Sequence, residues 1–176
     1  MCALPICLGE SVKEIFKSEN TIKEIAKVIQ DKHSAFFLGR GVNFPVALEG
    51  AIKLKEISYI HAEGFASGEM KHGPIALIEE GFPVIVIATN ESLSEKLMSN
   101  VEEVKARGAL TVGIVNKGNE NIKKHFDYCI EVPKVSEELT PILSVIPLQL
   151  LAYHVAVLKG LDVDKPRNLA KSVTVE

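Results

Sequence analysis

The sequence lacks an excess of basic residues, paired cysteines and histidines at metal-ligand spacing. Its 20 lysines and arginines are scattered among 23 acids and the net charge is −3, which excludes a basic nucleic-acid-binding surface. Cys2, Cys7 and Cys129 are odd in number, which is typical of a reducing cytosol, and we assign them no role. No two histidines have the spacing of a zinc site. We therefore expect a cytoplasmic protein with no metal and no nucleic-acid partner.

The sequence also lacks the marks of a secretion signal. Its first residues, MCALPICLGE, contain no basic region and soon turn charged, so we expect no signal peptide. Residues 139–158 carry no charge and are long enough to cross a bilayer. Two prolines, a glutamine and a histidine interrupt this run, however, which favours a helix buried in a protein core. We expect no membrane partner.

Apolar runs of strand length alternate with helical patterns, and no linker, repeat or low-complexity segment separates them. We expect strands at 35–38, 83–88, 109–115 and 128–132. We expect helices from Thr21, at 44–60, at 92–107 and at 138–159, the last one kinked or broken by Pro147. Strands that are apolar on both faces belong to parallel sheets covered by helices. The sequence therefore predicts one α/β domain over 1–176, a three-layer αβα sandwich with a mainly parallel sheet.

Three segments lie outside this alternation. Capping boxes at 11–14 and 21–24 predict helix starts within an N-terminal helical segment, 11–32. Residues 61–74 are rich in small side chains and are expected to form a loop. The tail, 161–176, is expected to form one helical turn after Pro166 and to dock through its apolar side chains.

A glycine turn, Gly39-Arg40-Gly41, follows the first expected strand. Its glycines would let backbone N–H groups converge on an anion, but an ordinary strand-to-helix turn explains them equally well. Asn43 and Pro45 then suit an N-cap and an early helical position. The third glycine of the dinucleotide pattern is missing, so we expect no nicotinamide cofactor.

Glu49, Lys53 and Glu56 form one polar stripe on the expected helix 44–60. Apolar neighbours suggest that this helix is buried on several sides, where a carboxylate can act as a general base and a lysine can stabilise an enolate oxygen. The same spacing also suits ion pairs on a solvated helix face. The residues alone leave both interpretations open.

His72, in the Gly/Pro-bounded run Lys71-His72-Gly73-Pro74, is the histidine with the best context for chemistry. His154 lies in an apolar helix and is expected to be a satisfied core residue. In the tail, a lysine held against apolar surface can lose its proton and attack a carbonyl, which makes Lys171 a candidate nucleophile.

Two segments together carry a resemblance to a known family: FLGRGVNFPVALEGAIKLKEISYIHAEGFASGEMKHGP and the ending DKPRNLAKSVTVE. They resemble the isomerase part of the glucosamine-6-phosphate synthases, the glutamine:fructose-6-phosphate amidotransferases. The likeness runs from about residue 20 to Glu176 and is to the second of the two sugar isomerase (SIS) domains of that family.

The resemblance implies roles for individual residues. Glu56 matches the base that moves a proton between C1 and C2, and Lys53 its supporting lysine. His72 matches a ring-opening histidine that is donated across a dimer interface, and Lys171 matches a lysine that forms a Schiff base with the open-chain ketose. The residues assigned to substrate binding are Arg167, Ala170, Gly39, Gly41 and Asn43.

The resemblance is also incomplete. A glutaminase domain and a first SIS domain, whose hydroxyl-rich turns hold the sugar phosphate in the family, are missing from these 176 residues. The matching turns here are poorer in hydroxyls, and Glu91 would repel a phosphate. We therefore expect an isomerase subdomain that converts fructose 6-phosphate and ammonia to glucosamine 6-phosphate without a cofactor, as a homodimer, and that depends on those domains in cis or in trans. A non-catalytic phosphosugar-binding module and a stand-alone phosphosugar isomerase remain the alternatives.

Overall fold

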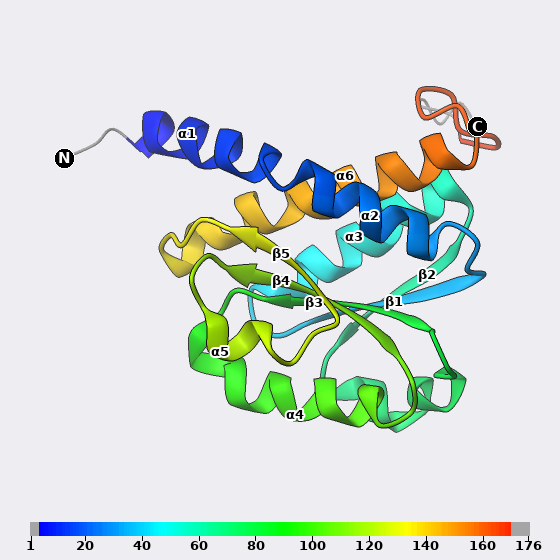
Figure 1. Cartoon of the computed structure of the whole chain (residues 1–176), viewed down its shortest axis with the longest axis horizontal. Helices are drawn as coiled ribbons and strands as arrows, with labels where there is room; N and C mark the ends of the chain where they lie inside the picture. Colours follow the sequence, from blue (N-terminus) through cyan, green and yellow to red (C-terminus); the bar gives the residue numbers. More distant parts are fainter. Residues whose placement is uncertain (1–3, 170–176) are drawn as a thin grey trace, which may run out of the picture.

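The apolar runs form the strands of one central sheet in a computed structural model that describes residues 4–169 (Figure 1). The sheet has five strands in the order β2-β1-β3-β4-β5. Each neighbouring pair runs parallel. The strands are β1 (Ser34–Gly39), β2 (His61–Ala66), β3 (Pro83–Ala88), β4 (Leu110–Asn116) and β5 (Tyr128–Val132).

Helices cover both faces of the sheet, which confirms the expected three-layer αβα sandwich (Figure 1). One face carries α1 (Leu4–Phe16), α2 (Glu19–Ile29), α3 (Asn43–Ser58) and α6 (Thr140–Leu158). The other face carries α4 (Ser94–Lys105), α5 (Glu120–Lys123) and the 3₁₀ helices η1 (Glu69–His72) and η2 (Pro74–Leu77). Two more 3₁₀ helices, η3 (Glu91–Leu93) and η4 (Glu137–Leu139), precede α4 and α6.

Successive residues of a strand face two separate cores. Phe37 of β1 and Ile85 of β3 pack beneath α2, α3 and α6, whereas Phe36 and Val84 pack on the α4 side. All four side chains are at most 1% exposed. Burial on both faces explains why the central strands are continuous apolar runs without polar alternation.

The loop expected at 61–74 is wrong in its first half, because His61–Ala66 forms the edge strand β2. This segment contains none of the β-branched residues that mark a strand in sequence. It is held by parallel pairing with β1 and by close packing on α3, since a Cβ on Gly64 would lie 2.9 Å from the Leu48 Cα. Tertiary contacts therefore decide this strand.

The expected helix starts near the N-terminus are also wrong. Ser11 lies in the middle of α1 and Thr21 inside α2, so neither side chain caps a helix. The side chains of Ile22, Ile25 and Ile29 form the buried face of α2. In the tail, residues 161–169 form turns and bends, without the helical turn expected after Pro166.

Helix α6 passes through Pro147 without a break and packs against α2 and α3. The segment Glu137–Leu158 is apolar and long enough to cross a membrane, and half of it is buried inside the structure. The core helix of a soluble protein has the same properties, as the sequence predicted for this run.

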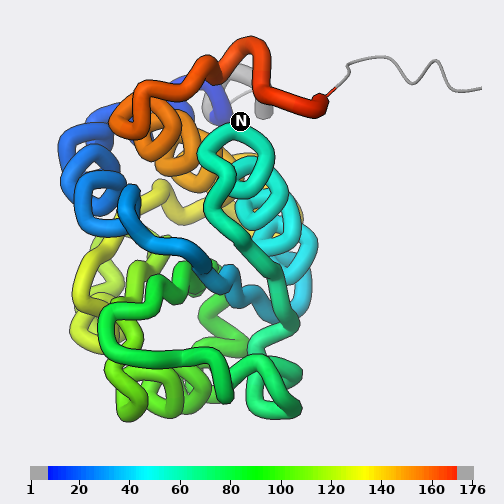
Figure 2. The backbone as a smooth tube through the Cα atoms, turned by 90° about the vertical axis from the view of Figure 1, so that its right-hand side faces the viewer, coloured from blue at the N-terminus to red at the C-terminus, as the bar shows by residue number. Residues whose placement is uncertain are grey.

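The strand order places a topological switch point between β1 and β3. In open parallel sheets, ligands bind at the carboxyl ends of the strands beside such a point. The turn from β1 into α3 and the turn after β3 both lie at this edge. The other end of α3 meets the tail (Figure 2).

Candidate active site

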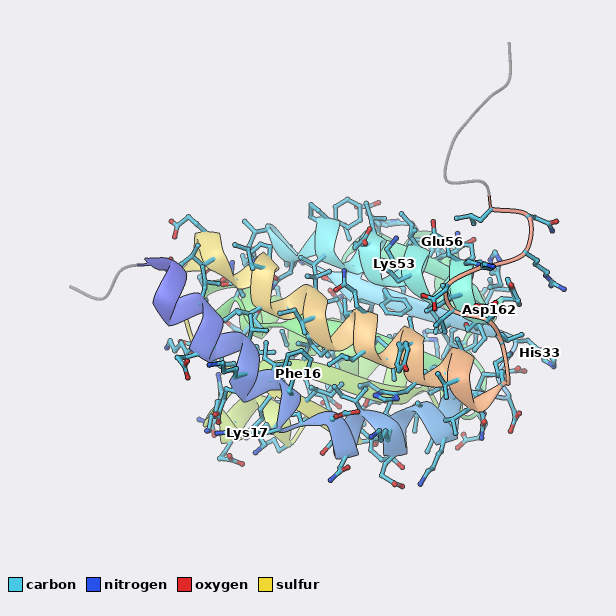
Figure 3. All side chains as sticks on the ribbon, turned by 90° about the horizontal axis from the view of Figure 1, so that it is seen from above. Phe16, Lys17, His33, Lys53, Glu56 and Asp162 are labelled. Atoms are coloured by element: carbon cyan, nitrogen blue, oxygen red, sulfur yellow. The ribbon has the colours of Figure 1, made fainter. Side chains whose placement is uncertain are left out.

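Lys53 and Glu56 lie on the C-terminal half of α3, on the side next to the tail (Figure 3). Lys53 Nζ donates a hydrogen bond to Glu56 Oε2 over 3.0 Å and lies 3.6 Å from Glu49 Oε1. The hydrogen bond with Glu56 raises the pKa of Lys53, so its ammonium stays charged at neutral pH. The expected polar stripe therefore exists as a cation held between two carboxylates.

This face of α3 is more open than the sequence suggested. Leu48 and Ile52, which flank the stripe, are 38% and 41% exposed. The side chains of Lys53 and Glu56 are 35% and 29% exposed. The prediction that α3 is buried on several sides is thus wrong for this side, and the stripe lies at a half-buried surface.

The tail forms the second wall of a cleft over this stripe. Lys53, Glu56 and Ile57 of α3 line one side. The tail lines the other with Val163, Asp164, Lys165, Pro166 and Leu169. The volume is about 590 Å³, within the range of small-molecule sites. The predicted docking of the tail is seen in its described part, whereas Ala170 and Lys171 lie outside the described residues.

Sequence reasoning missed Tyr59, which holds the tail at the end of α3. The backbone N–H of Arg167 donates to the Tyr59 hydroxyl over 2.8 Å, and the Arg167 guanidinium carbon lies 4.1 Å from the centre of the ring. These contacts join residues 108 positions apart, so no local pattern in the sequence signals them. They place Arg167 beside the cleft, as the sequence suggested.

His72 lies in the other helical layer. It ends η1, whose Met70 is buried in the core on the α4 side, and the neighbouring Lys71 pairs with Glu103 of α4 over 3.2 Å. The His72 side chain is exposed. Within one chain the sheet therefore separates His72 from Glu56, and the two would share a site only if His72 came from a second copy.

The glycine turn is at the opposite end of α3 from Glu56. Thirteen residues separate Asn43 from Glu56, which corresponds to about 20 Å along a helix. Asn43 is 1% exposed and does not cap α3. Its amide instead donates to Ile87 O over 3.4 Å and accepts from Thr89 Oγ1 over 3.2 Å. Gly39, Gly41 and Asn43 therefore cannot contact the same small sugar as Glu56 within one chain.

A second, smaller hollow of about 180 Å³ lies over the carboxyl ends of β3 and β4, and its polar groups already bond to one another. Glu91 accepts from Lys134 Nζ over 2.8 Å and from Asn116 Nδ2 over 3.4 Å. The bond with Lys134 lowers the pKa of Glu91, so this carboxylate is charged at neutral pH. The Lys134 ammonium balances the Glu91 charge that the sequence predicted to repel a phosphate.

His154 differs from the sequence prediction of a satisfied core histidine. It is buried, but its Nε2 makes no hydrogen bond and lies 3.4 Å from Glu19 Oε1. Burial lowers its pKa, so the ring stays neutral near pH 7. Within residues 4–169, no group of three or more His, Cys, Asp or Glu side chains could hold a metal ion.

Comparisons of the chain with a family model and with known proteins agree on one family. Residues 28–159 match the model of the SIS domain. The chain is 58% identical over 164 residues to the glutamine–fructose-6-phosphate aminotransferase (isomerizing) of Pyrobaculum aerophilum, covering 93% of this chain and 27% of that protein. It is 53% identical over 169 residues to the Escherichia coli protein of the same name, covering 96% and 28%. The chain thus spans just over a quarter of the length of these relatives.

A solved structure agrees with the sequence matches. The C-terminal domain of glucosamine-fructose-6-phosphate aminotransferase from Francisella tularensis is 44% identical and superposes with a TM-score of 0.81. The match covers 88% of this chain and 43% of that one. The fold described above is therefore shared with part of a longer domain.

Proposed function

The chain belongs to the SIS domain family, and from this membership we propose that it supplies the proton-transfer site of an isomerizing glutamine–fructose-6-phosphate aminotransferase. The observation that carries the proposal is the Lys53–Glu56 pair inside a cleft large enough for a hexose phosphate. The high identity to relatives of that name supports it.

Glu56 is the base in this proposal. With ammonia in place of the C2 carbonyl oxygen of fructose 6-phosphate, the Glu56 carboxylate removes a proton from C1. The electrons of that C–H bond form a C1–C2 double bond, while the electrons of the C2–N double bond move to the nitrogen, which takes up a proton. Glu56 then returns its proton to C2, as the C1 hydroxyl loses its own proton and becomes the aldehyde. Glucosamine 6-phosphate is the product. General acid–base groups and charge stabilisation suffice for such a shift, so we propose no cofactor.

Lys53 orients the carboxylate, because its ammonium donates to Glu56 and stays charged at neutral pH. In the tail, Lys171 forms a Schiff base with C2 of the open-chain ketose and releases the carbonyl oxygen as water, and ammonia then displaces the lysine amine to leave the C2 imine. Arg167 and Ala170 line the sugar. Arg167 lies beside the cleft in the structure, and Lys171 follows it by four residues. A four-residue segment spans at most about 14 Å, so the tail can bring an amine to this cleft.

The site needs more than one chain. We propose a cytoplasmic homodimer in which His72 of one copy opens the sugar ring bound at Glu56 of the other, because the sheet separates these two side chains within a copy. A first SIS domain and a glutaminase domain, in cis or in trans, hold the phosphate and release ammonia from glutamine. The full length of the relatives, nearly four times the matched part, leaves room for both domains.

A pair of matched variants tests the assignment of the base. Glu56→Gln and Glu49→Gln each remove one carboxylate beside Lys53. In the complete protein, Glu56→Gln should lower the rate of glucosamine 6-phosphate formation by about 10²–10⁴-fold, and Glu49→Gln should change it little. If Glu56→Gln kept a rate near that of the wild type, as Glu49→Gln should, Glu56 would not be the base. Calorimetric binding of fructose 6-phosphate without any turnover in the complete protein would favour a binding module instead.

A further inference from the structure

Tyr59 ends α3 in a backbone conformation that a tyrosine rarely adopts. Its φ and ψ are 60° and 18°, in the left-handed region where glycine is usual at the end of a helix. Over residues 4–169, Asn168 is the other non-glycine residue with a positive φ. A bulky residue is disfavoured in this conformation. Contacts of the Tyr59 side chain must therefore offset the strain in its backbone.

That side chain contacts the tail twice, both times at Arg167. The hydroxyl accepts the Arg167 N–H, and the ring lies within cation–π range of the guanidinium. Tyr59 therefore fixes both the main chain and the side chain of Arg167.

The tail is already folded where it reaches Tyr59. Asp162 Oδ1 accepts hydrogen bonds from the N–H groups of Asp164 and Lys165 over 3.0 and 3.1 Å. This turn reverses the chain after α6 and carries it across the end of α3 (Figure 2). Holding Arg167 therefore holds a shaped segment, which also forms one wall of the cleft.

The position of Tyr59 connects this contact to the proposed chemistry. Tyr59 follows Glu56 by three residues, or about 5 Å along the helix. One contact between the end of α3 and the tail thus fixes the wall of the cleft that faces the proposed base.

We propose that Tyr59 is a positioning residue that fixes the described part of the tail at the end of α3 and thereby holds the tail's wall of the cleft over Glu56. This proposal rests on the function proposed above. Tyr59 acts through Arg167 and the tail, while the reacting atoms are handled by Glu56 and Lys171. The hydroxyl and the ring contribute separately, so they can be removed one at a time.

Hydrogen exchange on the 176-residue chain tests the structural half of the proposal. Tyr59→Phe removes the hydroxyl and keeps the ring, and peptides covering 162–169 should exchange about 2–10-fold faster. Tyr59→Gly removes both contacts but suits the backbone, so exchange should rise further while the Tm stays the same or increases. Tyr153→Phe, on the exposed side of α6, is the control for loss of a hydroxyl and should leave this segment unchanged. Unchanged exchange in both Tyr59 variants would overturn the proposal.

Kinetics of the complete protein test the functional half. Tyr59→Gly should lower kcat about tenfold or more at unchanged Tm, and Tyr59→Phe should fall between it and the wild type. A drop in Tm with no graded fall in kcat would instead indicate a purely structural role and overturn the proposal. If turnover depends on Glu56 but both Tyr59 variants keep the wild-type kcat, the positioning role of Tyr59 is refuted and the proposed function stands. If turnover does not depend on Glu56, the proposed function fails, and the exchange data still report whether Tyr59 holds the tail.

Discussion

At the scale of single residues, charge pairing explains the chemistry proposed for α3. Glu56 shares its cation with Glu49, yet Glu56 lies nearer to Lys53 and lines the cleft. The hydrogen bond from Lys53 engages one Glu56 oxygen and leaves the other oxygen to accept a proton. The stripe that the sequence left open between ion pairs and a base thus forms ion pairs, and its Glu56 also lines the cleft.

Lys53 gives a prediction with a pH dependence. Because the hydrogen bond to Glu56 raises the pKa of Lys53 above its ordinary 10.5, the pair is intact below that pH and is lost only as the pH rises beyond it. Activity should therefore show no loss from Lys53 between pH 7 and about 10. Lys53→Met should lower kcat about 10–100-fold, and Lys53→Arg should restore most of it. A loss of activity near pH 8 in the wild type that is absent from Lys53→Met would contradict this account.

Cys129 should be an unreactive thiol. Burial raises its pKa to about 11, and its Sγ lies 3.6 Å from Lys123 O, to which the thiol can donate. At pH 8 only about one thiol in a thousand would be ionised. Peptide-resolved mass spectrometry after iodoacetamide treatment of the folded chain should find Cys129 labelled slowly, and fast on unfolding in urea. Rapid labelling in the native state would show that the thiol is more accessible than the structure indicates.

At the scale of the elements, the turn from β1 into α3 has a structural role that the sequence left undecided. A Cβ on Gly39 would lie 2.1 Å from the Asn43 carbonyl oxygen, which is backbone and cannot swing away. Gly41 has a φ of 57°. The glycines therefore allow the chain to close tightly on the first turn of α3, whatever else binds there.

Gly39→Ala tests this role. The clash should destabilise the fold by about 3 kcal/mol, or roughly 6–12 °C in Tm. Gly9→Ala is the control, because a Cβ at Gly9 meets nothing within 4 Å and alanine favours the helix. It should leave the Tm unchanged or raise it slightly. Thermal unfolding followed by circular dichroism measures both, and equal Tm values for the two variants would be contrary to the structure.

The elements also show how far sequence reasoning reaches. The run at 83–88 was predicted with the bounds of β3, because local hydrophobicity alone defines a strand buried on both sides. The run at 128–132 was predicted with the bounds of β5, although this edge strand is only partly buried. Strand β2 was missed because pairing with β1 and packing on α3, not composition, make it a strand. In the site, the spacing of Lys53 and Glu56 predicted their contact. The hydrogen bond between Arg167 and Tyr59 depends on tertiary structure instead, so the sequence did not predict it.

At the scale of the whole molecule, the chain has the features of one part of a larger assembly. Helix α6 is apolar on all sides, yet Ile142 and Tyr153 are 47% and 45% exposed, and α3 exposes Leu48 and Ile52 close to the cleft. These large apolar side chains are thus exposed on two helices of the same layer. The relatives are nearly four times longer than the matched part, which agrees with missing neighbours.

The central claim is that Glu56 of one copy and His72 of another form a single site, and mixing two inactive variants tests it most directly. In the complete protein, Glu56→Gln and His72→Asn should each be inactive alone. After subunits exchange at random, half of the dimers combine both variants and each carries one intact site, so about a quarter of the wild-type activity should return. A mixture that stays inactive, although mass spectrometry shows the mixed dimers, would contradict the shared site.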